Sequence, residues 1–123
     1  MKNKLMLTIL LAALVGGCAT NSSSVKYSHD VRQMSYADNS LFHDALNGPG
    51  GLAETDRTLF PAARRRTIIK IESLVPFKEQ QTGLERWTVQ HDGKDTCAYV
   101  VRYIPQGNGK VQVAVHKSSE TKP

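Results

Sequence analysis

The residue whose surroundings most clearly indicate chemistry is Cys18, because a thiol can be modified covalently. It follows two glycines and an uncharged apolar run, residues 5–15, which begins after Lys2 and Lys4. The 11 residues of that run are too few to cross a membrane, since a spanning helix needs about 20. They are typical of the central region of a secretory leader, a processing segment that is no part of the fold. The sequence therefore predicts export.

Residues 14–18, Leu-Val-Gly-Gly-Cys, resemble the lipobox of bacterial lipoproteins. The resemblance implies that residues 1–17 are a signal peptide and that Cys18 becomes an acylated N-terminus, which is the contact with the membrane. Several acyl chains on one residue anchor stably, since each buried CH₂ contributes ~0.8 kcal/mol. In this family an Asp after the cysteine retains the protein in the inner membrane. Ala19 stands there instead, which implies the periplasmic face of the outer membrane, or the outer surface of a host with one membrane. An ordinary leader with a chance cysteine is the alternative.

Removal of the leader changes the net charge of the chain, and acylation of Cys18 changes the number of cysteines available for a disulfide. Both limit the functions that the chain can have. Residues 18–123 are enough for one small domain and not for two. The leader takes two lysines with it, so the net charge falls from +5 to +3. That charge does not favour a nucleic-acid partner, although a weak attraction to anionic surfaces is compatible with it. Because lipid occupies Cys18, Cys97 has no disulfide partner within the chain. It is either a buried thiol or an exposed one that bridges two chains.

The other residues that could form a catalytic or metal-binding site give only weak signals in the sequence. Cys97 lies in an apolar strand, where burial raises the pKa of a thiol and makes it unreactive. Residues 48–51, Gly-Pro-Gly-Gly, are typical of a turn, and no nucleophile motif or phosphate-binding glycine loop is present. We therefore expect no enzyme, no catalytic residue, no cofactor and no metal site. The histidines share no zinc-type spacing with one another or with a cysteine: His29, His43, His91 and His116.

The one dense charge run is Arg64, Arg65 and Arg66. Guanidinium groups grip phosphate or carboxylate through paired hydrogen bonds. Near an outer membrane such groups could contact lipid head groups, an acidic cell-wall component or an acidic protein. We expect a weak anion contact here; the alternative is a solvated connection that precedes a strand.

The elements that must position these residues follow from hydrophobic periodicity. Residues 38–46 and 52–60 have helical spacing, with Glu54 and Asp56 in the first turns of the second helix. Alternation or apolar content predicts strands over 67–74, 86–91, 96–104 and 110–117, and residues 27–34 form a short strand or loop. Strand 96–104 is apolar on both faces, so it should be central. One of its faces would be covered by the helices, and the other by a curled sheet or a partner.

The resulting fold class is α+β, with short N-terminal helices packed on an antiparallel β-meander of about four strands. Residues 1–17 are the signal peptide, 18–28 a lipidated N-terminus and flexible tether, 29–117 the small domain and 118–123 a polar tail. The aromatic side chains of Trp87, Tyr99 and Tyr103 either pack in the core across strands or form an exposed platform for a glycan or peptide.

These features predict a non-enzymatic binding or scaffolding module at the cell envelope, with an unknown envelope protein as partner. It would be an accessory to an envelope or secretion assembly. The segments 87–94 and 97–103 resemble the sheet region of small, poorly characterised Gram-negative lipoproteins, a resemblance that carries no site residues. The alternative is a periplasmic inhibitor or immunity lipoprotein that blocks a toxin or cell-wall hydrolase. It would use a rigid exposed loop such as residues 105–109 or 78–83.

Overall fold

The structure, a computed structural model, describes residues 24–78 and 81–119. Among these residues no helix is long and apolar enough to cross a membrane. The leader, Cys18 and residues 120–123 of the tail lie outside the described residues. The elements follow one another as β1 (Val25–Tyr27), α2 (His29–Gln33), α3 (Asn39–Asn47), α4 (Leu52–Leu59), β2 (Arg66–Val75), β3 (Gly83–His91), β4 (Asp95–Pro105) and β5 (Val111–Lys117).

The five strands form one sheet in the order β1-β2-β3-β4-β5. The last four strands are antiparallel neighbours joined in sequence, which confirms the α+β class and the β-meander. Two finer expectations are wrong. The helices are not N-terminal because β1 precedes them, and the sheet is mixed because β1 pairs parallel with the start of β2. A three-residue strand is too short to show a period, so its sequence carried no signal.

The N-terminal boundary also differs from the expected one. Residues 27–34 form the end of β1 and the short helix α2, where the sequence pattern predicts a strand or loop. The Oγ of Ser28 starts that helix by accepting a hydrogen bond of 3.1 Å from the N–H of Val31. Val25 is buried, so the ordered domain includes residues that the sequence assigns to a tether. Ser118 is likewise buried, and its N–H donates to the carbonyl of Ala98.

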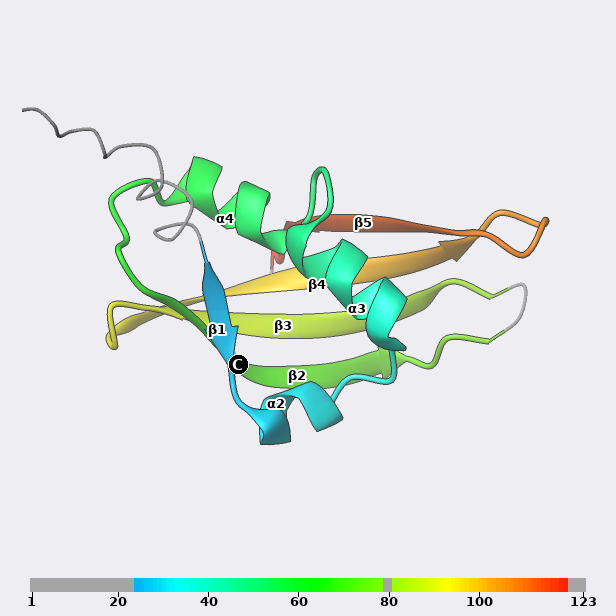
Figure 1. Ribbon diagram of the computed structural model, residues 1–123, viewed down its shortest axis with the longest axis horizontal. Coiled ribbons are helices and arrows are strands. Elements are labelled where there is room, and N and C mark those ends of the chain that lie inside the picture. The colour runs from blue at the N-terminus through cyan, green and yellow to red at the C-terminus, as the bar shows by residue number, and fades with distance from the viewer. Residues whose placement is uncertain (1–23, 79–80, 120–123) are drawn as a thin grey trace, which may run out of the picture.

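Helices α3 and α4 lie close to their expected ranges and cover one face of the sheet (Figure 1). Asp38 caps α3, because its carboxylate accepts a hydrogen bond of 2.8 Å from the N–H of Leu41. The ring of Phe42 on α3 stacks on Trp87 of β3 at 4.9 Å between ring centres. Trp87, Tyr99 and Tyr103 are all fully buried, which confirms that they pack in the core.

Strand β4, predicted to be central, lies between β3 and β5. Its residues 97, 99, 101 and 103 are buried, on the face of the sheet that α3 and α4 cover. The alternating residues Ala98 and Val100 are half-buried on the opposite face. The prediction that helices cover one side of this strand is therefore confirmed.

Candidate functional site

The arginine run divides into two kinds of residue. Arg64 and Arg65 are exposed, and their backbone N–H groups donate to Oδ1 of Asp92 at 3.1 and 2.9 Å. The hydrogen bond from the N–H of Arg65, followed in effect by that from Arg64, lowers the pKa of Asp92. Arg66 is only 3% exposed. It points inward from the first residue of β2, so the expectation that it contacts an external anion is wrong.

Arg66 forms an ion pair with a carboxylate of the protein itself, that of Asp56. Its Nε donates to Oδ2 of Asp56 at 2.7 Å, and its Nη2 donates to the carbonyl of Phe60 at 2.8 Å. Asp56 is fully buried. An unpaired charge is very costly to bury. The buried guanidinium of Arg66 and the buried carboxylate of Asp56 therefore each compensate the charge of the other.

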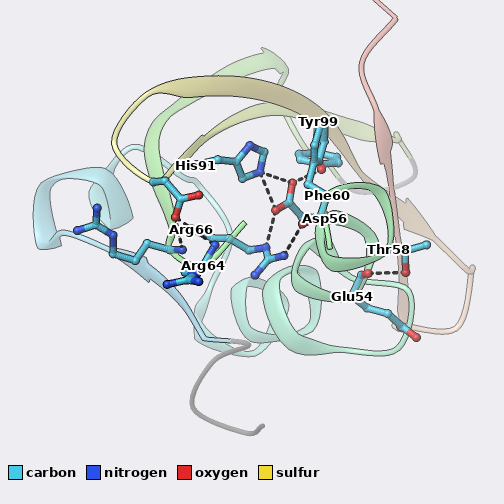
Figure 2. A network of polar contacts seen from close by, with 10 residues as sticks. Glu54, Asp56, Thr58, Phe60, Arg64, Arg66, His91 and Tyr99 are labelled. Atoms are coloured by element: carbon cyan, nitrogen blue, oxygen red, sulfur yellow. Dashed lines mark hydrogen bonds and ion pairs between the residues drawn. The ribbon is translucent and has the colours of Figure 1, made fainter. Parts of the chain in front are cut away.

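Two further side chains complete a cluster around Asp56, seen in Figure 2. The Nε2 of His91 on β3 lies 2.9 Å from each carboxylate oxygen, and the hydroxyl of Tyr99 on β4 donates to Oδ1. Burial, followed by the hydrogen bond to Asp56, raises the pKa of Tyr99. The phenol therefore stays protonated and donates. The cluster ties helix α4 to three neighbouring strands.

A second buried carboxylate, Glu85 of β3, ties the segment between α2 and α3 to the sheet. It is fully buried and its contacts are all with neutral donors. Burial, followed by the charge of Glu85, raises the pKa of Tyr103. Its donors are Ser35 Oγ at 3.0 Å, the N–H of Tyr36 at 2.9 Å, Trp87 Nε1 at 3.0 Å and Tyr103 Oη at 2.8 Å.

The sequence reasoning missed both carboxylates, although one signal was available for Asp56. In α4 the buried residues are Leu52, Ala53 and Asp56, so Asp56 lies three and four residues after apolar residues and shares their face. An acid on the apolar face of a short helix indicates a buried partner. Glu85 alternates with Trp87 and Val89 on one face of β3, which is the corresponding signal in a strand.

A groove lies between α4 and the edge strand β5, with a volume of ≈ 660 Å³. Residues 49–50, 54–55 and 58–59 line its helical side, and Val115, His116 and Lys117 line its strand side. Leu59 is 46% exposed at this groove. Because the Asp56 cluster holds the inner face of α4, it also fixes the outer face of α4 as a wall of the groove.

The remaining predicted site residues do not converge. His29, His43 and His116 are exposed. Cys97 is buried and free of any disulfide, and burial raises the pKa of its thiol. Within residues 24–78 and 81–119, no group of three or more His, Cys, Asp or Glu side chains is arranged to hold a metal ion. We infer that the groove is the candidate site, because it lies beside the last strand of the sheet.

No family model matches the chain, and no solved structure matches it. A curated protein similar to it is "Transcription factor ccg-8" from Neurospora crassa, with 28% identity over 97 residues. The match covers 78% of this chain and 15% of that protein, so the chain spans less than a sixth of its length.

Proposed function

We propose that this protein is a lipid-anchored lipoprotein of the cell envelope that acts as a non-enzymatic binding module. The lipobox pattern around Cys18 supports the anchor, with the periplasmic face of the outer membrane as its place. The groove between α4 and β5 supports binding. Because the match covers 15% of the fungal transcription factor, that protein's role is not carried over to this chain.

The single observation that carries the binding role is a groove beside β5, whose outer edge pairs with no other strand among the described residues. Strand β5 is the last strand in the sheet order, and the groove runs beside it. Ligand sites are concave, largely apolar, and carry a few polar groups that set orientation. This groove has an apolar side chain in Leu59, a cation in Lys117 and hydroxyls on α4 at Thr55 and Thr58.

The anchor is tested by metabolic labelling with a fatty acid, followed by membrane fractionation. We expect the wild-type chain to take up the label and to sediment with membranes. The Cys18→Ser variant should retain its leader, take up no label and fail to mature. A Cys18→Ser variant that is labelled as strongly as the wild type would contradict the lipid anchor.

The binding role is tested in cells with a photo-crosslinking amino acid placed at one position at a time. Position 58 lies in the groove wall, and position 70, on the exposed side of β2, is the matched control. We expect one discrete adduct from position 58, identified by mass spectrometry, and none from position 70. Equal adducts from both positions, or none from position 58, would overturn this proposal.

An inhibitor or immunity role is the second candidate, and the turn after β4 favours it. The N–H of Gln106 donates to the carbonyl of Lys110 at 2.9 Å, and the N–H of Lys110 donates to Oδ1 of Asn108 at 3.1 Å. This exposed turn is therefore held in one shape. If crosslinks form from position 108 and not from position 58, the turn is the binding element.

A further inference from the structure

We propose that the groove takes an extended, acidic polypeptide segment, which adds to the sheet as a sixth strand beside β5. This inference rests on the proposed binding function and names its ligand class. Strand addition to an open sheet edge is a general mode of peptide recognition. Backbone hydrogen bonds supply the affinity, and alternate side chains supply the specificity.

The ladder between β4 and β5 shows which backbone groups of β5 are available. The N–H of Ser118 donates to the carbonyl of Ala98, and the N–H of Gln106 donates to the carbonyl of Lys110. Both pairs belong to the same register, in which Val101 opposes Val115. Since hydrogen-bonded pairs alternate along an antiparallel ladder, the even-numbered residues 112, 114 and 116 bond to β4. The backbone groups of residues 111, 113, 115 and 117 therefore point away from the sheet.

The same odd-numbered residues place their side chains on the face covered by the helices. Val115 opposes the buried Val101, and Lys117 opposes the buried Tyr99. Both line the groove. An incoming strand on this edge would place alternate side chains against Val115 and the exposed part of Leu59. Its other side chains would continue the opposite face of the sheet.

Charge selects the kind of strand that fits. Residues 106–119 contain Lys110, His116 and Lys117 and no acid. On the helical side of the groove the one acid is Glu54, whose carboxylate accepts a hydrogen bond from the N–H of Gly50. Lysine on an edge strand discourages pairing with a like strand. In a second copy of β5 paired antiparallel with Val113 opposite Val115, Lys117 would lie opposite Val111, and residues 106–119 of the two copies would together carry four lysines and no acid. A segment with an acidic residue opposite Lys117 meets that cation favourably on the face that the helices cover.

The outer edge of β2 is a weaker candidate for strand addition. Strand β1 already pairs with residues 66–68 of that edge. Beyond them the register of β2 is irregular between Ile68 and Lys70 and again between Ser73 and Val75. Bulges of this kind twist an edge away from pairing. The register of β5 is regular along its whole length.

The test uses the processed full chain in detergent and the fluorescent peptide Glu-Thr-Val-Thr-Val-Thr-Glu, in which the valines lie opposite Val115 and Val113 when a terminal glutamate lies opposite Lys117. Fluorescence anisotropy measures binding. We expect saturable binding, and about tenfold or greater weakening when every peptide nitrogen is methylated, because methylation removes the N–H donors that would pair with β5. A lysine-ended peptide should bind more weakly, and Lys117→Glu should reverse the order of the two peptides.

A substitution in the protein tests whether the outward N–H groups of β5 bind the peptide. Val113→Pro removes one outward N–H, while Val113→Thr keeps it at similar volume, and thermal unfolding confirms that both variants fold. Proline is tolerated on an edge strand where the N–H faces solvent. We expect the proline variant alone to lose most of its affinity for the glutamate-ended peptide.

Three outcomes overturn the inference: no saturable binding of the glutamate-ended peptide, equal binding of its methylated form, or dimerisation through β5 that the peptide does not displace. Analytical ultracentrifugation detects the last. If position 58 still crosslinks to a cellular partner in those cases, the binding role stands and only the strand mode fails.

Discussion

At the scale of single residues, the adjacent arginines Arg65 and Arg66 have different structural roles. Arg65 is exposed and contributes a backbone N–H, whereas Arg66 is buried and contributes its side chain. No local pattern separates them, because the difference arises from Asp56, ten residues earlier, and from the sheet that brings them together. The sequence therefore located the charge run but could not tell which of its members faces the interior.

The cost of breaking the Asp56 cluster is a direct prediction. Asp56→Ala leaves the buried guanidinium of Arg66 without its carboxylate, and removing one partner of a buried ion pair costs about 3–5 kcal/mol. We expect a large fall in the urea midpoint. The exposed Asp44→Ala on α3 is the control and should change the free energy of unfolding by less than about 0.5 kcal/mol. Similar losses of stability in both variants would show that the Asp56 cluster makes no special contribution to the free energy of unfolding.

At the scale of elements, long strands and the helices with a clear apolar face are predictable from sequence, whereas β1 and α2 are not. Strand β4 alternates buried residues along its length, and α3 has both a side-chain cap and a buried face. In contrast, β1 has three residues and α2 has five, and both depend on tertiary contacts such as the burial of Val25 and Val31. The groove could not be predicted, because it exists only between two elements far apart in sequence.

The turn between α3 and α4 gives a prediction about how these elements are joined. A Cβ on Gly51 would lie 2.8 Å from the carbonyl oxygen of Ala45 and 2.9 Å from that of Gly48, which is closer than real contacts allow. We expect Gly51→Ala to destabilise the fold by about 1–3 kcal/mol, in the range for overpacking. Chemical denaturation measures this. Arg57→Ala, on the exposed side of α4, is the control; a neutral Gly51→Ala would mean that the turn can relax.

At the scale of the whole molecule, two buried carboxylates hold α4 and the segment between α2 and α3 to the sheet, and their phenol donors make the domain less stable at alkaline pH. Burial, followed by the charge or hydrogen bond of the nearby carboxylate, raises the pKa of Tyr99 and Tyr103. The same causes, burial first and the charge of Glu85 second, raise that of Tyr36 to about 12.

Unfolded tyrosine ionises near pH ~10, whereas the folded chain keeps these protons. The unfolded state therefore binds fewer protons above that pH, and stability falls as the pH rises. We expect the free energy of unfolding to decline from about pH 10 upward, by up to about 1.4 kcal/mol per pH unit for each fully protected phenol. Urea titrations between pH 8 and 11 measure the slope. Tyr103→Phe should have a shallower slope than wild type, whatever its stability at pH 8, and an unchanged slope would contradict this origin.

Strand order and chain order are the same in this sheet, so the first strand and the last strand occupy opposite edges. Four spacings of about 4.8 Å separate β1 from β5, a width of ~19 Å across the sheet. The described chain nevertheless begins on the same side as the groove, because Ser24 lies in one hollow with Pro49 and Glu54, and both of these residues also line the groove. In a chain held to a surface from its amino-terminal side, the length of chain before Ser24 would therefore set how much room a second molecule has between the groove and that surface.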